Sequence, residues 1–224
     1  MSQYLVRRAV AAVPLDAEPS HPVWAAAEVA CVSCFHSSSS VHRPVTQARV
    51  LHDERNLYLQ FDVQDQYVRA VETEYQAAVC QDSCVEFFVQ PKAGKGYFNF
   101  EFNCAGTMLL MYIEDPTVVG DRLRRFCAVW PEHARQVRIR STVASPIHKE
   151  IAEPTRWRLS VCVPVSVFEP YVGPVLPING HPWRANFYKC ADKSSHPHWA
   201  SWSPINGYLN FHQPQYFGAL SFEP

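Results

Sequence analysis

Hydrophobic and polar residues alternate without interruption along residues 97–103, which read Tyr-Phe-Asn-Phe-Glu-Phe-Asn. Successive side chains of a β-strand point to opposite faces, so the three phenylalanines share one face of a predicted strand. The other face carries Tyr97, Asn99, Glu101 and Asn103. The phenylalanine row indicates that the strand packs on a core. The polar row indicates either a solvated outer face or a polar binding surface.

The same alternation predicts further strands along the chain. Residues 47–51 and 57–63 flank a His-Asp-Glu-Arg-Asn turn, which is typical of a hairpin. In the second of these strands we expect the apolar residues to point inward and Tyr58, Gln60 and Asp62 to point outward. Other predicted strands cover residues 85–90, 97–103, 108–113, 136–143, 157–163, 183–190 and 217–222.

Helical character is confined to two short stretches. Residues 65–78 are expected to form a helix and residues 164–168 a single helical turn, while residues 114–135 show no regular pattern. Proline, histidine and asparagine predict long loops over residues 170–182 and 194–215. Trp24 follows an acidic, proline-rich turn and is expected to anchor a core.

Many short strands with little helix predict an all-β fold, an antiparallel β-sandwich of the jelly-roll kind with long loops. The chain has 224 residues, 47% of them hydrophobic and 18% charged, so it can bury a substantial core. Because no linker or internal repeat divides it, we expect residues 1–224 to form a single domain.

The charge balance argues against some partners. The net charge is −1 and no basic stripe is present, so neither nucleic acid nor a membrane is an expected partner. No apolar run approaches the roughly 20 residues that span a bilayer. The first 13 residues hold too short and interrupted an apolar stretch for a signal peptide, which favours a cytoplasmic location. If a signal peptide had been removed from the chain, a secreted or periplasmic location would be expected instead.

The chain has eight cysteines, a number that fits either redox compartment. Cys31 and Cys34 form a C-x-x-C pair, but no second pair exists, and the spacing to His36 and His42 fits no common zinc module. We therefore expect small buried or half-buried thiols rather than a metal site, and the sequence leaves their disulfide pairing open. Four cysteines fall in or beside predicted strands, as core or sheet residues: Cys104, Cys127, Cys162 and Cys190.

Two more predicted strands repeat the arrangement of an apolar row opposite a polar row. Arg184, Asn186 and Tyr188 share one face of residues 183–189, and Glu86 lies opposite a core row in residues 85–89. If the strands belong to one sheet, these groups converge, and an arginine among carboxylates would form charge-assisted hydrogen bonds. Amides, carboxylates and a guanidinium beside aromatic rings are groups that recognise sugars. Four loop aromatics could supply stacking or could plug the core beneath the loop: Trp199, Trp202, Tyr208 and Phe211.

Several of these segments, taken in order, resemble family 9 carbohydrate-binding modules. They are Ala48–Asp53 with the Leu-Tyr-Leu of residues 57–59, Asp82–Val89, Asn99–Asn103 followed by Gly106, Ala200–Pro204, and the Phe-Gly-Ala-Leu of residues 217–220. The resemblance covers nearly the whole chain. It implies a β-sandwich, often with bound calcium, that grips sugar units at chain ends and is frequently appended to xylan-degrading enzymes.

The resemblance assigns roles to some positions and shows departures at others. The family's binding glutamate matches Glu86, whereas its binding arginine on the next strand falls on Glu101. One of the two tryptophans that sandwich the sugar falls at about Phe211, and the other falls near Val79 or Cys80, where no aromatic residue stands. The ligand chemistry is therefore expected to differ from that of the family.

The expected function is non-catalytic binding of oligosaccharides or sugar chain ends of plant-type polysaccharides such as xylan, with a glycoside hydrolase as an associated partner. The expected ligand-binding residues are Glu86, Asn99, Glu101, Asn103, Arg184, Asn186, Tyr188, Trp199 and Phe211. Calcium is the cofactor that the resemblance suggests, and Asp53, Asp62 and Asp65 are oxygen donors of the right kind, although they also suit solvated turns.

Three alternatives remain open on the sequence. A glycoside hydrolase could use Glu86 and Glu101, because such enzymes hold two carboxyl groups roughly 5–9 Å apart. A haem-binding redox module of related fold would need axial ligands from Met108, Met111, His196 or His198. The third is an interaction domain without a small ligand. No nucleophile elbow, phosphate loop or H-E-x-x-H motif is present.

Overall fold

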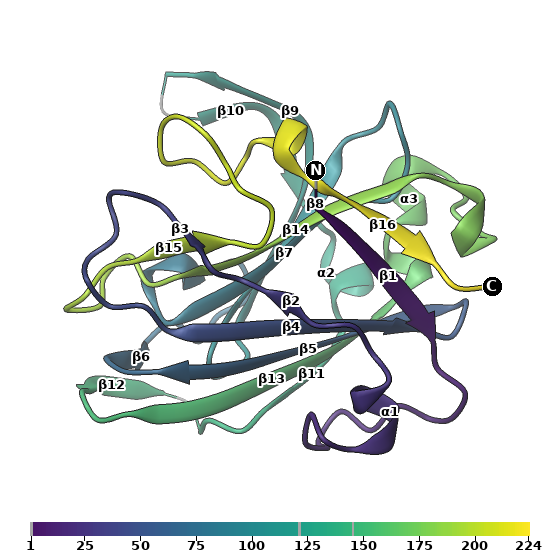
Figure 1. The fold of residues 1–224 in the computed structure, drawn as a ribbon. Helices are drawn as coiled ribbons and strands as arrows, with labels where there is room; N and C mark the ends of the chain where they lie inside the picture. Colours follow the sequence, from purple (N-terminus) through teal and green to yellow (C-terminus); the bar gives the residue numbers. More distant parts are fainter. Residues whose placement is uncertain (1, 121, 145) are drawn as a thin grey trace.

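A computed structural model describes residues 2–120, 122–144 and 146–224, and it forms a β-sandwich of two packed sheets (Figure 1). The first sheet runs, in hydrogen-bonded order, through β10 (Arg122–Ala128), β9 (Met108–Val119), β8 (Tyr97–Asn103), β7 (Cys84–Gln90), β14 (Trp183–Cys190), β16 (Gly218–Phe222) and β1 (Gln3–Arg8). The second sheet runs through β1, β4 (Val45–His52), β5 (Asn56–Asp65), β13 (Thr155–Pro164) and β11 (Arg138–Ser141).

Short elements complete the fold. β15 (Trp199–Ser201) joins β14 to β3 (Cys34–Phe35), β2 (Ala30–Cys31) pairs with β4, and β6 (Val68–Ala70) pairs with β12 (Ile147–Ile151). The short helical segments are α1 (Pro22–Ala25), η1 (Val79–Gln81), α2 (Pro131–Ala134), η2 (Val165–Val167), α3 (Glu169–Val172), η3 (Ile178–Gly180) and η4 (Pro214–Tyr216). No helix in the described part of the chain is long and apolar enough to cross a membrane.

β1 connects the two sheets. Its residues 3–6 pair with β16 and its residues 7–8 pair with β4, in both cases in parallel orientation. The strand therefore passes from one sheet to the other at one edge of the sandwich (Figure 1). The sandwich is otherwise antiparallel along the main path, as the sequence predicts, although the alternation did not single out β1.

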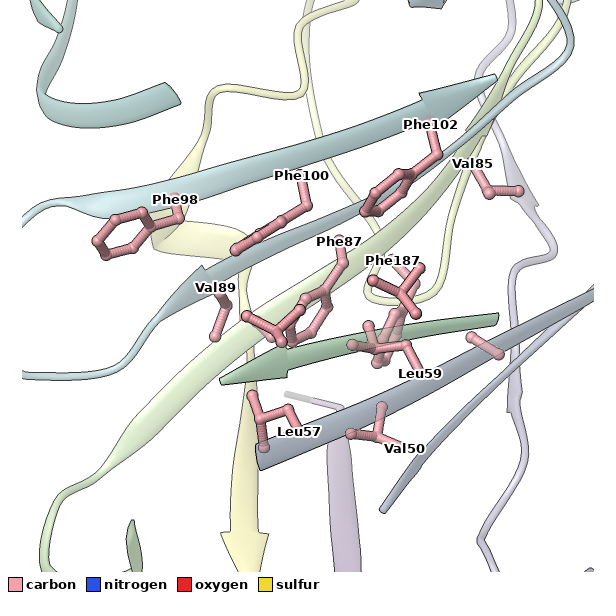
Figure 2. Packing of buried hydrophobic residues seen from close by; sticks show 14 of the residues in the cluster. Val50, Leu57, Leu59, Val85, Phe87, Val89, Phe98, Phe100, Phe102 and Phe187 are labelled. Carbon is pink, nitrogen blue, oxygen red and sulfur yellow. The ribbon is translucent and has the colours of Figure 1, made fainter. Parts of the chain in front are cut away.

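The core lies between the inner faces of the two sheets. Phe98, Phe100 and Phe102 of β8 are fully buried there, which confirms the inward row predicted from the alternation. Phe87 of β7 and Phe187 of β14 stack with ring centroids 5.3 Å apart, and aliphatic side chains of the second sheet face them (Figure 2). This packing fixes β8, β7 and β14 side by side and directs their polar rows to the opposite, outer face.

The outer face of the second sheet is covered by the N-terminal segment that contains α1. Trp24 is fully buried against Leu51, Tyr58 and Cys162, which confirms its predicted role as an anchor. Its indole N–H donates to the carbonyl of Pro14 at 2.9 Å. The outward row of β5 is consequently buried rather than solvated.

The predicted helix over residues 65–78 is wrong. This stretch contains the end of β5, the short strand β6 and turns. The buried carboxylate of Asp82 accepts hydrogen bonds from the backbone N–H groups of Val71 and Glu72, each at 2.9 Å. Those donors would be used inside a helix, so a contact from outside the segment decides its conformation.

Residues 114–135 are more regular than their sequence suggests. β9 continues to Val119 and pairs with β10 at the edge of the first sheet, and α2 follows. β10 is largely exposed and carries Arg122, Arg124 and Arg125. An edge strand with little buried surface has no need of an apolar row, so alternation could not reveal it.

Candidate functional site

The outer face of β8, β7 and β14 is partly covered by residues 202–217, which run from β15 back to β16. The Phe211 ring stacks on Tyr188 with centroids 4.1 Å apart and an interplanar angle of 14°. Phe217 packs edge-on against Tyr97 at 5.3 Å, and the Tyr97 hydroxyl is hydrogen-bonded to Nδ1 of His212 at 2.7 Å. The aromatic part of the polar face is therefore the floor beneath a loop.

Next to this loop a pocket of about 310 Å³ stays open on the same face. Strand residues Glu86, Phe88, Glu101 and Cys190 contribute to it, as do Cys80, Asp192 and Trp199 from the flanking segments. The loop supplies the remaining wall with Leu209, Asn210, Phe211 and His212. Carboxyl groups and aromatic rings thus line one open pocket.

Glu86 and Glu101 lie directly opposite each other on the antiparallel strands β7 and β8. Both are buried, with 2% and 7% of their surface exposed. Asn99 donates to Glu101 Oε1 at 2.8 Å, and the Cys190 thiol donates to Glu86 Oε1 at 3.1 Å. The register of two hydrophobic strands, rather than a loop, positions these carboxyl groups.

The electrostatics of this pair favour protonation. Burial raises the pKa of Glu101 to about 7, and burial followed by the neighbouring Glu101 charge raises the pKa of Glu86 well above its usual range. Two carboxylates opposite each other cannot both ionise cheaply, so the pair retains a proton near neutral pH. Such a pair can donate one hydrogen bond and accept several others.

Trp199 borders the pocket where β15 begins. It is half-buried, and its indole N–H donates to Asp192 Oδ1 at 2.7 Å. Burial raises the pKa of the Asp192 carboxyl. This hydrogen bond fixes the position of the Trp199 ring at the edge of the pocket. Phe211 lines the same pocket.

Four of the nine residues predicted for the site line the pocket, namely Glu86, Glu101, Trp199 and Phe211. The two predicted asparagines of β8 are buried and have structural partners. Asn99 holds Glu101 and accepts from the backbone of Met111 at 3.1 Å. Asn103 donates to the carboxylate of Asp82 at 3.0 Å. It therefore helps to hold the region around β6 and does not line the pocket.

The three predicted residues of β14 anchor the loop over residues 202–217. Arg184 donates to the backbone carbonyls of residues 215 and 217, at 3.1 and 2.8 Å, which corrects the expectation of a fork to carboxylates. Asn186 donates to the carbonyl of Ser203 at 2.9 Å, and the Tyr188 hydroxyl donates to that of Phe211 at 3.1 Å. Sequence analysis could not foresee that this loop consumes their hydrogen-bonding groups.

Two further loop aromatics also have definite positions. Trp202 packs against Phe187 at 5.5 Å between centroids and closes over Gly218, where a Cβ atom would lie 2.5 Å from the indole. Trp202 therefore fills the edge of the hydrophobic core. Tyr208 is 65% exposed and does not border the pocket.

Sequence analysis did not assign Cys80, Asp192, Asn210 or His212 to the pocket. Asp192, Asn210 and His212 lie in turns or loops and Cys80 lies in the short segment η1, where no periodicity marks the direction of a side chain. Cys190 was assigned to the core or sheet without a partner; it ends β14, and its thiol lies 3.1 Å from Glu86 Oε1.

The three aspartates considered for calcium do not form a cation site. Asp53 accepts from the Asn56 amide and the Tyr58 hydroxyl, at 3.0 and 2.6 Å. Asp62 is bound by the Arg156 guanidinium through two hydrogen bonds, at 2.9 and 2.8 Å. Asp65 is in contact with the Lys189 ammonium at 3.2 Å. Because side-chain donors occupy these oxygens, the three residues do not fit calcium.

Three of the histidines considered on the sequence as metal or haem ligands, His36, His42 and His198, are hydrogen-bonded within the protein. The ring nitrogens of His198 contact Lys189 Nζ at 2.7 Å and the carbonyl of His196 at 2.9 Å, so neither is free for an axial bond. His36 is hydrogen-bonded to the carbonyl of Gly207 and His42 to Asp65. All eight cysteines are free thiols.

Comparisons with known proteins agree with this architecture. The family model described as carbohydrate-binding family 9 matches residues 20–222. A solved structure from Bacteroides uniformis ATCC 8492, described provisionally as a carbohydrate-binding protein, is 32% identical, with a TM-score of 0.85 and 99% of each chain covered. No curated protein matches the chain.

Two structures of a family 9 module from Caldicellulosiruptor kristjanssonii share the fold at lower identity. The complex with cellotriose is 14% identical with a TM-score of 0.65, covering 99% of this chain and 94% of the other. The complex with glucose is 12% identical with a TM-score of 0.64, covering 99% and 96%. Since the family model spans nearly the full length, the chain belongs to carbohydrate-binding family 9.

Proposed function

We propose that the chain binds the terminal unit of an oligosaccharide in the pocket formed by Glu86 and Glu101, without cleaving it. The observation that carries the proposal is the buried carboxyl pair beside two aromatic rings, Trp199 and Phe211, on one open surface. Family membership supports carbohydrate as the class of ligand.

The chemistry of the pocket suits a sugar. A sugar hydroxyl both donates and accepts hydrogen bonds, and a carboxyl pair that retains one proton can answer in both senses. Trp199 and Phe211 offer apolar surface to the C–H groups of a pyranose ring. The volume of about 310 Å³ is near the lower end of the range for ligand sites, which supports one or two sugar units rather than a long chain.

For the identity of the sugar we propose β-linked plant-type oligosaccharides. Cellotriose and glucose are the sugars bound in the structures of the Caldicellulosiruptor kristjanssonii module, which supports gluco-configured units. Xylan chain ends, with a glycoside hydrolase as associated partner, are supported by the family resemblance. A xylo-unit lacks the exocyclic hydroxymethyl group, so a comparison of the two sugar series distinguishes these ligands.

The carboxyl pair also favours a second candidate, a glycoside hydrolase, because one of its groups stays protonated near neutral pH. Residues opposite each other on antiparallel strands have Cβ atoms about 5 Å apart and project side by side from the floor. A hydrolase needs its two carboxyl groups to flank the scissile bond. Binding is therefore the function we prefer, and the absence of turnover of aryl β-glucosides and β-xylosides would agree with it.

The test is a calorimetric titration of the full chain with glucose, cellobiose, cellotriose, xylobiose and xylotriose. We expect saturable binding of at least one series that is lost in Trp199→Ala and weakened at least tenfold in Glu101→Gln. Trp130→Ala is the matched control, because this tryptophan is 59% exposed and lies outside the pocket. Folded protein that binds none of these sugars, or equal binding by Trp199→Ala, would overturn the proposal.

A further inference from the structure

We propose that Cys84, Glu86 and Cys190 form a binding site for a borderline-soft divalent cation, with Zn²⁺ as the expected ion. One donor atom from each residue lies within 4.8 Å of the other two, and all three residues are buried. This site is separate from the aspartates considered for calcium. It does not depend on sugar binding.

The strand register assembles the three donors. Cys84 and Glu86 are two residues apart on β7, so their side chains share the outer face. Cys190 pairs directly with Cys84 across the ladder between β7 and β14. Regular sheet geometry therefore brings two thiols and a carboxyl together without a loop.

The distances suit tetrahedral zinc. With Zn–S bonds of about 2.3 Å and Zn–O bonds of about 2.0 Å, tetrahedral ligands lie about 3.8 Å (S to S) and about 3.5 Å (S to O) apart. Cys190 Sγ and Glu86 Oε1 are 3.1 Å apart, so a small rotation of side chains would open the space for the ion. Two thiolates and one carboxylate select zinc over magnesium or calcium, which prefer oxygen ligands.

The charge at this position also points to a cation. Within the described residues Glu86 has no ion pair, and its side-chain hydrogen bond comes from the Cys190 thiol, a weak donor. Glu101 lies directly opposite and adds a second carboxyl group. A buried carboxyl pair without a cation is costly to ionise, and a divalent ion would compensate that charge.

The pocket provides access and a fourth ligand. Glu86 and Cys190 both border it, so an ion held by the three side chains would face the pocket with its remaining coordination position. Water or a sugar hydroxyl can occupy that position, as in zinc sites with three protein ligands. The site would thus add a Lewis acid to the floor of the pocket.

The experiment uses the full chain, reduced with a phosphine and freed of metal. Co²⁺ is titrated first, because a thiolate–cobalt bond gives a charge-transfer absorption, and Zn²⁺ is then added in competition. We expect one Co²⁺ per chain, displaced by one Zn²⁺. The absorption should disappear in Cys84→Ser and Cys190→Ser, and Glu86→Gln should bind at least tenfold more weakly. Cys104→Ser is the matched control, since Cys104 is equally buried but outside the cluster.

A second measurement keeps the proposal testable if a serine variant folds poorly. In the wild-type protein, Zn²⁺ should protect Cys84 and Cys190 from alkylation under mild denaturant, while the exposed Cys31 stays reactive. Reduced wild-type protein that binds neither ion, or an unchanged cobalt spectrum in Cys84→Ser, would overturn the proposal. Sugar titrations of metal-free and zinc-loaded protein are read separately, so failure of the metal site leaves the sugar proposal to its own test.

Discussion

Replacement of Lys189 by methionine tests how this fold manages buried charge. The Lys189 side chain is completely buried, with its ammonium 3.2 Å from Asp65 Oδ2 and 2.7 Å from His198 Nε2. His42 contacts the other carboxylate oxygen of Asp65 at 2.8 Å. Methionine keeps the length and apolar stem of lysine but removes the charge. The variant therefore leaves Asp65 without its ammonium partner, with hydrogen bonds only to His42, the backbone N–H of Gln66 and the indole of Trp157.

We expect Lys189→Met to lower the free energy of unfolding by a large amount. Removal of one partner of a buried ion pair typically costs about 3–5 kcal/mol, because the remaining charge is buried without compensation. The double variant Asp65→Asn/Lys189→Met buries two neutral groups of similar shape and should recover most of this loss. The coupling energy between the two substitutions should therefore reach about 2–3 kcal/mol.

The pH dependence gives an independent check with a definite sign. Burial alone would raise the pKa of Asp65, but the Lys189 charge and the His42 hydrogen bond outweigh it and hold the pKa well below its usual 3.8. The pair therefore contributes stability above pH 3.8, and this contribution is lost as the pH falls further. Without Lys189 the largest influence that lowers the pKa of Asp65 is lost, so this pKa should rise and acid should cost the variant less stability than it costs the wild type.

The assay is urea unfolding at pH 7 and at pH 4.5 for the two single variants and the double variant. Lys149→Met, at an exposed lysine of β12, is the control for loss of one positive charge. If Lys189→Met lowers the free energy of unfolding by no more than Lys149→Met does, the buried pair does not provide the stability expected of it. A double variant as unstable as the sum of the single variants would refute the coupling.

Two further predictions concern protonation and calcium. Burial lowers the pKa of His212 to about 4, so the folded protein should lose stability as the pH falls from 6.5 towards 4, by at most about 3 kcal/mol. His212→Gln should show a shallower pH dependence in urea unfolding, and an unchanged slope would contradict this reasoning. Because Lys189 and Arg156 already neutralise Asp65 and Asp62, millimolar calcium should leave the Tm of the reduced, metal-free protein unchanged. A rise of several degrees with calcium, measured by scanning calorimetry, would reveal a calcium site outside these aspartates.

Much of the framework could be predicted because strand periodicity is a local property. The alternation at residues 97–103 placed β8 with its bounds, and the phenylalanine row lies in the core as expected. The hairpin of β4 and β5 follows the same rule. Glu86 and Glu101 were recognised as a candidate pair because each lies opposite an apolar row on a predicted strand.

Other features depend on contacts between distant residues, and periodicity carries no information about them. The carboxylate of Asp82, which lies outside residues 65–78, accepts hydrogen bonds from the backbone N–H groups of residues 71 and 72. These donors are then not available to a helix. The loop over residues 202–217 covers the face that holds Asn186 and Tyr188 and uses their polar groups as anchors. A polar side chain on an outer strand face looks the same in sequence whether it meets solvent, a ligand or a loop.

The sequence by itself determined that the chain is a β-sandwich, which side chains fill its core and which polar rows face outward. Only the tertiary structure decided which part of the outer face remains open, that Lys189 stands beside Asp65, and that Cys84 and Cys190 meet across a ladder. The physical reason is how far apart along the chain the interacting residues lie. Burial of alternate side chains is specified residue by residue, whereas partners of buried polar groups are chosen from anywhere along the folded chain.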